Sequence, residues 1–170
     1  MTTLLRLCLP LAAALLTSCA GYQLGGVKPA HLAEVTRIAV PTFKNNTLEP
    51  RLAVLVTNAV IKQLQADGTY QIVSKDDADA VLEAEINYVD RGQFRAVRNN
   101  VLRTSQLLVR LRTSYRLVST ADGTALHRGQ VIGESYIVLD PNWQISERQG
   151  MEDAAQRLGV TMASEISEGW

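Results

Sequence analysis

The chain has 170 residues, and its 17 lysines and arginines balance 17 aspartates and glutamates, so its formal net charge at neutral pH is zero. This balance excludes a polycation that binds nucleic acid through bulk charge, and the length suits one domain with a single core. The two cysteines, Cys8 and Cys19, both lie in a segment that reads as a targeting signal. We therefore expect neither a disulfide nor a cysteine-ligated metal in the mature chain.

Residues 1–18 have the pattern of a cleaved signal peptide. Arg6 precedes an apolar run that is shorter than the roughly 20 residues of a membrane-spanning helix. The run ends in Leu-Thr-Ser-Cys at residues 16–19, the pattern of a bacterial lipobox, which implies cleavage before Cys19 and acylation of that residue. Several acyl chains together give a stable anchor. Ala20 in place of aspartate favours the outer membrane, whereas the alternative is an ordinary secreted protein in which Cys19 is incidental.

After a lipidated N-terminus and short tether (residues 19–30), residues 31–170 predict a single domain. The β-branched stretch 35–43 indicates a buried strand, with Pro41 near its end. Pro50 then opens a helix whose apolar residues share one face, and Asp67-Gly68 ends it.

A short strand over residues 70–74 is followed by an acidic stretch, Asp76, Asp77 and Asp79, which we expect to be a solvated loop. Alternation of apolar and polar residues in 82–88 and 107–117 predicts a long antiparallel hairpin about Asn99-Asn100.

The alternation places Leu82, Ala84, Ile86 and Tyr88 on one face of this hairpin. The same register sets Glu83 opposite Arg116 and Asn87 opposite Arg112. Cross-strand pairs of this kind contribute a few tenths of a kcal/mol to about 1 kcal/mol.

Asp122-Gly123 predicts a turn into a further strand over residues 125–139, in which Gly129 and Gly133 suggest bulges or bends. Ser146 with Gln149 resembles a capping box that opens a second helix, with apolar residues at helical spacing from Met151 to Ile166. Gly150 and Gly159 weaken this helix but allow it to lie close to the sheet. The predicted fold is α+β (β-α-β-β-β-α), with two helices on one face of a sheet.

No group of residues in the chain forms a catalytic motif, so we expect no enzyme, no cofactor and no metal site. His31 and His127 are isolated in the sequence, and we expect each to be a surface or partly buried histidine and not a ligand. The glycines lack the pattern of a phosphate-binding loop or of a nucleophile elbow. Nucleic acid is disfavoured as a partner by export and by the lack of aromatic residues interleaved with the basic ones.

Basic residues dominate the predicted hairpin, because no acidic residue lies between Arg91 and Arg116. Arg95, Arg98 and Arg103 lie near its tip without an acidic neighbour, whereas Arg91 adjoins Asp90. Guanidinium groups pair with phosphate in a bidentate manner, so Arg91, Arg95, Arg98 and Arg103 are candidates for binding an anionic glycolipid, lipopolysaccharide. The alternative is that they serve solubility or contacts with a partner.

Three segments resemble the LptE family of lipopolysaccharide-assembly lipoproteins. They are CAGYQL at residues 19–24, RIAVPTFKNNTLEPRL at residues 37–52 and DADAVLEAEI at residues 77–86. The most specific part is the string Phe-x-Asn-x-Thr-x-Glu-Pro that ends at Pro50. The resemblance implies two helices on a roughly four-stranded mixed sheet. It also implies an outer-membrane protein, anchored from the periplasmic side, that plugs and supports an LptD-type β-barrel from within its lumen during lipopolysaccharide export.

The strand phrase IAVPTFKNNT is also loosely shared with two other classes of envelope lipoprotein. These are the curli-secretion lipoproteins and the activators of penicillin-binding proteins, so an adaptor or activator role is the alternative. The activators carry a long linker that crosses peptidoglycan, and the curli subunit is longer and contributes membrane strands. The short tether of this chain fits neither class as well as it fits the LptE family.

Overall fold

The structure of the protein is a computed structural model that describes residues 28–97, 100–138 and 143–169, with side chains except those of residues 95–105 and 143. The described helices are the short 3-10 helices η2 (Ala30–Leu32) and η3 (Lys75–Asp77) and the α-helices α2 (Leu52–Asp67) and α3 (Trp143–Glu168). The strands are β1 (Arg37–Ala39), β2 (Lys44–Asn45), β3 (Gln71–Ile72), β4 (Ala80–Val97), β5 (Asn100–Ser119) and β6 (Ala125–Val138).

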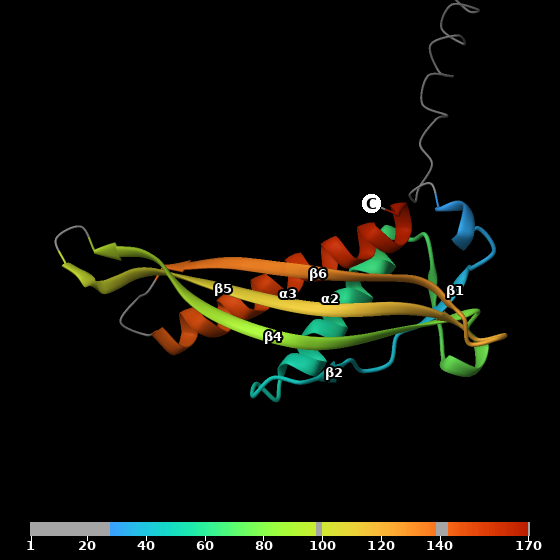
Figure 1. Cartoon of the computed structure of the whole chain (residues 1–170), viewed down its shortest axis with the longest axis horizontal. Helices are drawn as coiled ribbons and strands as arrows, with labels where there is room; N and C mark the ends of the chain where they lie inside the picture. Colours follow the sequence, from blue (N-terminus) through green and yellow to red (C-terminus); the bar gives the residue numbers. More distant parts are fainter. Residues whose placement is uncertain (1–27, 98–99, 139–142, 170) are drawn as a thin grey trace, which may run out of the picture.

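These six strands form one mixed sheet. The long strands β4, β5 and β6 are antiparallel neighbours, β1 pairs in parallel with β3 and β4, and β2 pairs in parallel with β4. Both α-helices lie behind the long strands in Figure 1, with α3 running along them and α2 crossing them. The predicted α+β class and layer order are confirmed. The strands are six rather than about four because the stretch around Pro41 splits into β1 and β2, and β3 joins beside β1.

Helix α2 matches its prediction closely. Its buried side chains recur every four residues and include Val56, Val60 and Leu64, which lie in the main core. Gly68 ends the helix with a φ of 75°, and its N–H donates to the Leu64 carbonyl at 3.1 Å. Glycine adopts this left-handed conformation without the steric cost that a Cβ brings. Within the described residues, no helix combines the length and the apolar character needed to span a bilayer.

Helix α3 packs closely on β6 and on α2, and its start corrects one prediction. The helix begins at Trp143, so Ser146 lies inside the first turns and does not cap it. The prediction that small residues let the helix lie close is confirmed, because a Cβ at Gly150 would collide with Ile137 of β6. The other glycine of the helix, Gly159, faces α2 instead of the sheet: a Cβ there would lie 2.9 Å from the Ala59 carbonyl oxygen.

The two glycines of β6 do not mark bulges, so that prediction was wrong. Regular pairing with β5 continues through Gly129 and Gly133. Both glycines instead make room for a neighbour on the core side: the ring of Tyr115 lies over Gly129, and the Ala154 carbonyl of α3 lies against Gly133. The absence of a side chain is needed here for close approach and not for a bend.

The hairpin of β4 and β5 is confirmed, but a β-bulge corrects its later register. Ile86 pairs with Thr113 and Tyr88 pairs with Arg112, so Asn87 is the extra residue in β4. Its Oδ1 atom accepts hydrogen bonds from the Ser114 N–H at 3.0 Å and the Ser114 hydroxyl at 2.7 Å. A bulge shifts the alternation by one residue. Tyr88 therefore points away from the helices, contrary to the prediction, and Asn87 does not face Arg112.

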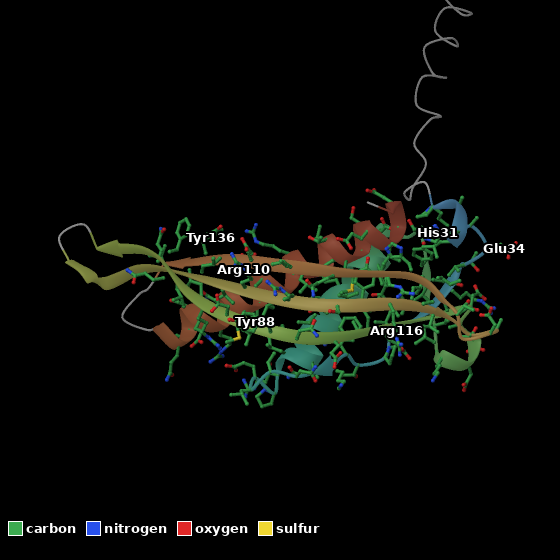
Figure 2. All side chains as sticks on the ribbon, in the orientation of Figure 1. His31, Glu34, Tyr88, Arg110, Arg116 and Tyr136 are labelled. Carbon is green, nitrogen blue, oxygen red and sulfur yellow. The ribbon has the colours of Figure 1, made fainter. Side chains whose placement is uncertain are left out.

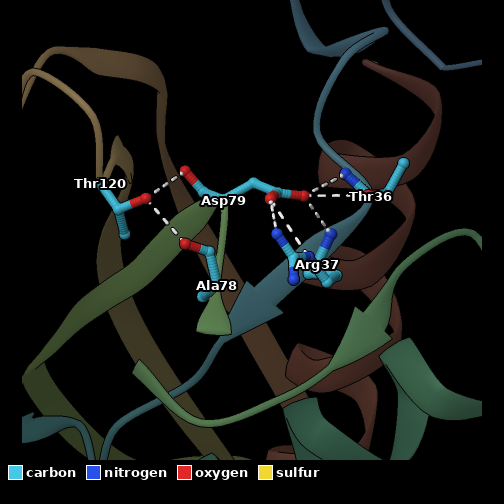
Figure 3. A network of polar contacts seen from close by, with 5 residues as sticks. All are labelled: Thr36, Arg37, Ala78, Asp79 and Thr120. Atoms are coloured by element: carbon cyan, nitrogen blue, oxygen red, sulfur yellow. Dashed lines mark hydrogen bonds and ion pairs between the residues drawn. The ribbon is translucent and has the colours of Figure 1, made fainter. Parts of the chain in front are cut away.

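The acidic stretch before β4 is not simply a solvated loop, because Asp79 joins three elements (Figure 3). Its Oδ2 atom accepts from both backbone N–H groups of Thr36 and Arg37, at 3.0 and 2.8 Å, and from the Thr36 hydroxyl. Its Oδ1 atom accepts from the Arg37 guanidinium at 2.7 Å. The Thr120 hydroxyl donates to the carbonyls of Ala78 and Asp79. This network fixes the start of β4 to β1 and to the turn after β5.

Candidate interaction surface on the outer face of the sheet

The face of β4, β5 and β6 that points away from the helices carries its side chains in rows set by the strand register. One row is Tyr88, Arg112 and Ile132, and the next is Asp90, Arg110 and Glu134. A third row pairs Gly92, Leu108 and Tyr136. Figure 2 shows Tyr88, Arg110 and Tyr136 on the three neighbouring long strands. We call this surface the outer face.

The outer face exposes large apolar side chains that a core would normally bury. Tyr88 is 49% exposed and Tyr136 is 55% exposed, and the face also carries Phe94, Ile132 and Val138. The rings of Phe94 and Tyr136 meet edge to face with centroids 4.5 Å apart. Contiguous exposed apolar surface of this kind marks an interaction site in a soluble domain, whereas isolated exposed residues do not.

A salt bridge lies in the middle of the outer face. The Arg110 Nε donates to Glu134 Oε1 at 2.6 Å. The hydrogen bond and charge of Glu134 raise the pKa of Arg110, with a further contribution from Asp90. The guanidinium is therefore held in place between the apolar rows. The outer face thus presents aromatic rings around a fixed ion pair, which suits a partner surface of mixed polarity.

Arg91, which the sequence made a candidate for lipopolysaccharide binding, lies on the opposite, helix-covered side. The bulge at Asn87 turns Arg91 inward, where it donates to Glu49 at 2.5 Å and to Glu147 of α3. Burial disfavours the charged form, but the hydrogen bonds and charges of Glu49 and Glu147 outweigh burial and raise the pKa of Arg91. Arg91 thus joins the loop before α2, strand β4 and the first turns of α3.

We expect Arg91→Gln to lower the free energy of unfolding by about 1 kcal/mol, because two carboxylates lose their shared counter-charge while remaining partly accessible to water. Urea denaturation monitored by circular dichroism measures this change. Affinity for purified lipopolysaccharide should stay at the wild-type value. A loss of lipopolysaccharide binding with unchanged stability would support the assignment of Arg91 to lipopolysaccharide binding.

The structure does not describe the side chains of the other residues assigned from the sequence. The backbones of Arg95 and Arg103 belong to β4 and β5, whereas their side chains are not described. Arg98 and Cys19 lie outside the described residues. The hairpin that carries the three arginines extends beyond the start of α3 (Figure 1).

A groove of about 920 Å³ opens near the other end of the long strands, and its charges are mostly paired. Arg116 binds Glu83 at 2.7 Å, which confirms the predicted cross-strand pair, and Lys44 binds Glu85 at 2.6 Å. Arg128 also lines the groove. The four other charged residues of the groove neutralise one another in these two ion pairs.

The expected placement of the two histidines is confirmed, since His31 is exposed and His127 is partly buried, but the two side chains contact each other. The rings of His31 in η2 and His127 in β6 are stacked with centroids 5.7 Å apart. His127 Nε2 lies 3.1 Å from the Tyr115 hydroxyl, which donates to Glu165 at 2.7 Å. Burial, helped by His31, lowers the pKa of His127.

This cluster fastens η2 to the sheet and to α3. The sequence offered no signal for it, because its members are far apart in the chain. Among the residues that the structure describes, no three histidine, cysteine, aspartate or glutamate side chains gather to hold a metal ion.

A match to a family model shows the family of the chain. The family model "LptE: Lipopolysaccharide-assembly" matches residues 35–167. The chain belongs to the LptE family. A search of curated proteins gives no match.

Solved structures similar to this LptE-family chain share its fold at low sequence identity. Protein XCC0632 from Xanthomonas campestris aligns with a TM-score of 0.59 at 7% identity, covering 85% of this chain and 91% of that one. A minor lipoprotein from Acinetobacter baumannii has a TM-score of 0.58 at 14% identity and covers 78% and 93%. The PelC dodecamer from Paraburkholderia phytofirmans has a TM-score of 0.54 at 14% identity and covers 84% and 94%.

Proposed function

We propose that this LptE-family protein is a non-enzymatic outer-membrane lipoprotein of the lipopolysaccharide export machinery. In this proposal residues 1–18 are removed as a signal peptide, Cys19 is acylated, and residues 31–170 form the working domain. The domain plugs and supports an LptD-type β-barrel, and Arg95, Arg98 and Arg103 at the hairpin tip contact lipopolysaccharide.

The outer face of the sheet is the observation that carries the barrel assignment. Tyr88, Phe94 and Tyr136 expose aromatic rings on a rigid sheet, and the two tyrosines also present hydroxyl groups. The lumen wall of a membrane barrel is largely polar, so a plug needs side chains that combine an apolar body with a polar end. A surface with both aromatic rings and the Arg110–Glu134 pair meets that requirement.

Co-purification from outer membranes tests the proposal. The wild-type chain should co-purify with the LptD-type barrel, and its depletion should remove lipopolysaccharide from the cell surface. Tyr88→Ser combined with Tyr136→Ser should reduce the barrel-bound fraction about tenfold, the size expected when a central aromatic anchor is removed. Ile145→Ser is the matched control, because Ile145 is 50% exposed but lies on α3.

Three results would count against the proposal or part of it. A wild-type chain that co-purifies with a murein synthase or a curli channel, and not with a barrel of LptD type, would favour the adaptor role. If the double variant binds the barrel as well as the wild type does, the outer face does not contact the barrel. For the hairpin tip, replacing Arg95, Arg98 and Arg103 by alanine should weaken lipopolysaccharide binding, and unchanged affinity in a folded protein would exclude the tip.

A further inference from the structure

The loop between β2 and α2 displays one apolar side chain entirely to solvent. Leu48 is 99% exposed, the highest exposed fraction among the large hydrophobic side chains that the structure describes. The first turn of α2 follows at once and carries Val54, which is 57% exposed. An exposed leucine at a loop tip is common, so the state of the loop decides whether it has a role.

Hydrogen bonds within the loop fix the residues on both sides of Leu48. The Asn45 side chain accepts from the Thr47 N–H at 3.0 Å and from the Thr47 hydroxyl at 2.7 Å, and it donates to the Glu49 carbonyl at 2.7 Å. The Thr47 hydroxyl in turn accepts from the Glu49 N–H at 3.2 Å. The residues before and after Leu48 are therefore hydrogen-bonded to each other, whereas the Leu48 side chain itself is exposed to solvent.

Further bonds fix the loop to the body of the domain. The Asn46 N–H donates to the Ile86 carbonyl at 3.0 Å, and the Asn46 side chain donates to Glu85 at 2.6 Å. Glu49 accepts from Arg91 at 2.5 Å. The loop cannot move without breaking these contacts to β4, so the backbone that carries Leu48 is fixed before a partner binds.

From this geometry we propose that Leu48 is a preorganised anchor that inserts into an apolar pocket on the barrel protein. The inference rests on the proposed function and adds to it a second contact, separate from the outer face. An apolar side chain on a fixed backbone loses less entropy on binding than one on a mobile loop, and buried single anchors of this kind dominate the affinity of protein interfaces. The neighbouring Arg51 is exposed and has no ion-pair partner among the described residues, so the rim of the pocket should carry a carboxylate.

The position of the loop favours a protein over the lipid bilayer as the partner. The described chain starts beside the far end of α2, where the Lys28 ammonium lies 5.0 Å from the Tyr70 ring centroid. Leu48 precedes the opposite end of this 16-residue helix, which is about 24 Å long. The two ends are seen in Figure 1. The described chain thus begins at one end of α2, and Leu48 lies at the other.

Competition for the barrel tests the anchor. Full-length variant and wild-type chains carrying different tags are co-expressed, and their ratio is measured in the fraction bound to the LptD-type barrel. Leu48→Ala should be under-represented about tenfold, whereas Leu48→Met, which keeps the apolar volume, should compete nearly equally. Because Leu48 is exposed, its variants should keep the wild-type melting temperature.

A second pair of variants tests whether the fixed loop matters for binding, in addition to the apolar side chain of Leu48. Thr47→Val removes the hydroxyl that holds the loop but keeps the size of the side chain, and it should reduce competition several-fold with Leu48 still present. Thr47→Ser keeps the hydroxyl and should compete like the wild type. Equal competition by Leu48→Ala, or by Thr47→Val, would overturn the proposal of a preorganised anchor.

Two further outcomes are distinguishable. If the wild-type chain does not bind the barrel at all, the proposed function fails and the anchor fails with it, whereas wild-type binding with equal competition by Leu48→Ala overturns the anchor alone. A fluorophore on Leu48→Cys, in the acylated chain on vesicles of phosphatidylethanolamine and phosphatidylglycerol without barrel, should report a water-exposed site. A report of insertion into the vesicle would assign the loop to lipid and overturn the proposal.

Discussion

Gly133→Ala should lower the free energy of unfolding by about 3 kcal/mol, the largest effect that we expect from a single small substitution. A Cβ at Gly133 would overlap the Ala154 carbonyl oxygen and would lie 2.7 Å from the Leu158 Cβ and 2.9 Å from the Leu158 nitrogen. These atoms belong to the backbone and inner face of α3, so no side-chain rotation relieves the overlap. Helix α3 has to move away from β6, which opens the core between them.

Thermal unfolding measures this effect, and Gly92→Ala is its matched control. A change of about 3 kcal/mol corresponds to a fall of roughly 10 °C in the melting temperature of a domain of this size. A Cβ at Gly92 of β4, in contrast, meets no atom within 4 Å. Gly92→Ala should therefore be neutral or slightly stabilising, since it restricts the unfolded chain. A melting temperature for Gly133→Ala within about 2 °C of the control would show that α3 does not approach β6 this closely.

The parts of the fold that follow from local pattern were predictable. Helix α2 begins at Leu52, two residues after Pro50, and ends at Asp67. It was predictable because its apolar spacing and the glycine that ends it lie in one short stretch of sequence. The pair of Glu83 and Arg116 was predicted from alternation, and the structure places them opposite each other because the register shifts nearer the tip compensate for one another. Such features depend on residues near in sequence or related by a regular period.

The features that determine the outer face depend on contacts distant in sequence. Asn87 creates the bulge by bonding to Ser114 on the neighbouring strand, and that bulge moves Tyr88 outward and Arg91 inward. The acidic partners of Arg91 lie 42 and 56 residues away, in the loop before α2 and in α3. A run of arginines without acidic neighbours in sequence therefore resembles an anion site even when one of them is neutralised in space.

Asp79→Asn should lower the free energy of unfolding by about 2 kcal/mol at neutral pH. The carboxylate accepts from two backbone N–H groups, a hydroxyl and the Arg37 guanidinium. The amide keeps one acceptor oxygen but directs an NH₂ group at one of these donors. Water partly screens the charge interaction with Arg37, because the Asp79 side chain is 27% exposed, and this limits the loss to about 2 kcal/mol. Asp76→Ala, in the exposed turn of η3, is the control and should be within about 0.5 kcal/mol of the wild type.

The pH dependence of the same variant identifies the charge as the cause. The hydrogen bonds from Arg37, first those of its side chain and then that of its N–H, hold the pKa of Asp79 well below its ordinary value of about 3.9. A carboxyl group whose pKa is lower in the folded state contributes its full stability above the unfolded pKa, and this contribution is lost as the pH falls towards the folded pKa.

The gap in unfolding free energy between the wild type and Asp79→Asn should therefore be constant from about pH 5 to 7 and should narrow below about pH 4. Urea titrations at several pH values measure it. The asparagine side chain cannot ionise, so a difference in unfolding free energy that depends on charge must change at low pH. If the difference stays the same, the stabilisation comes from the shape of the carboxyl group and not from its charge.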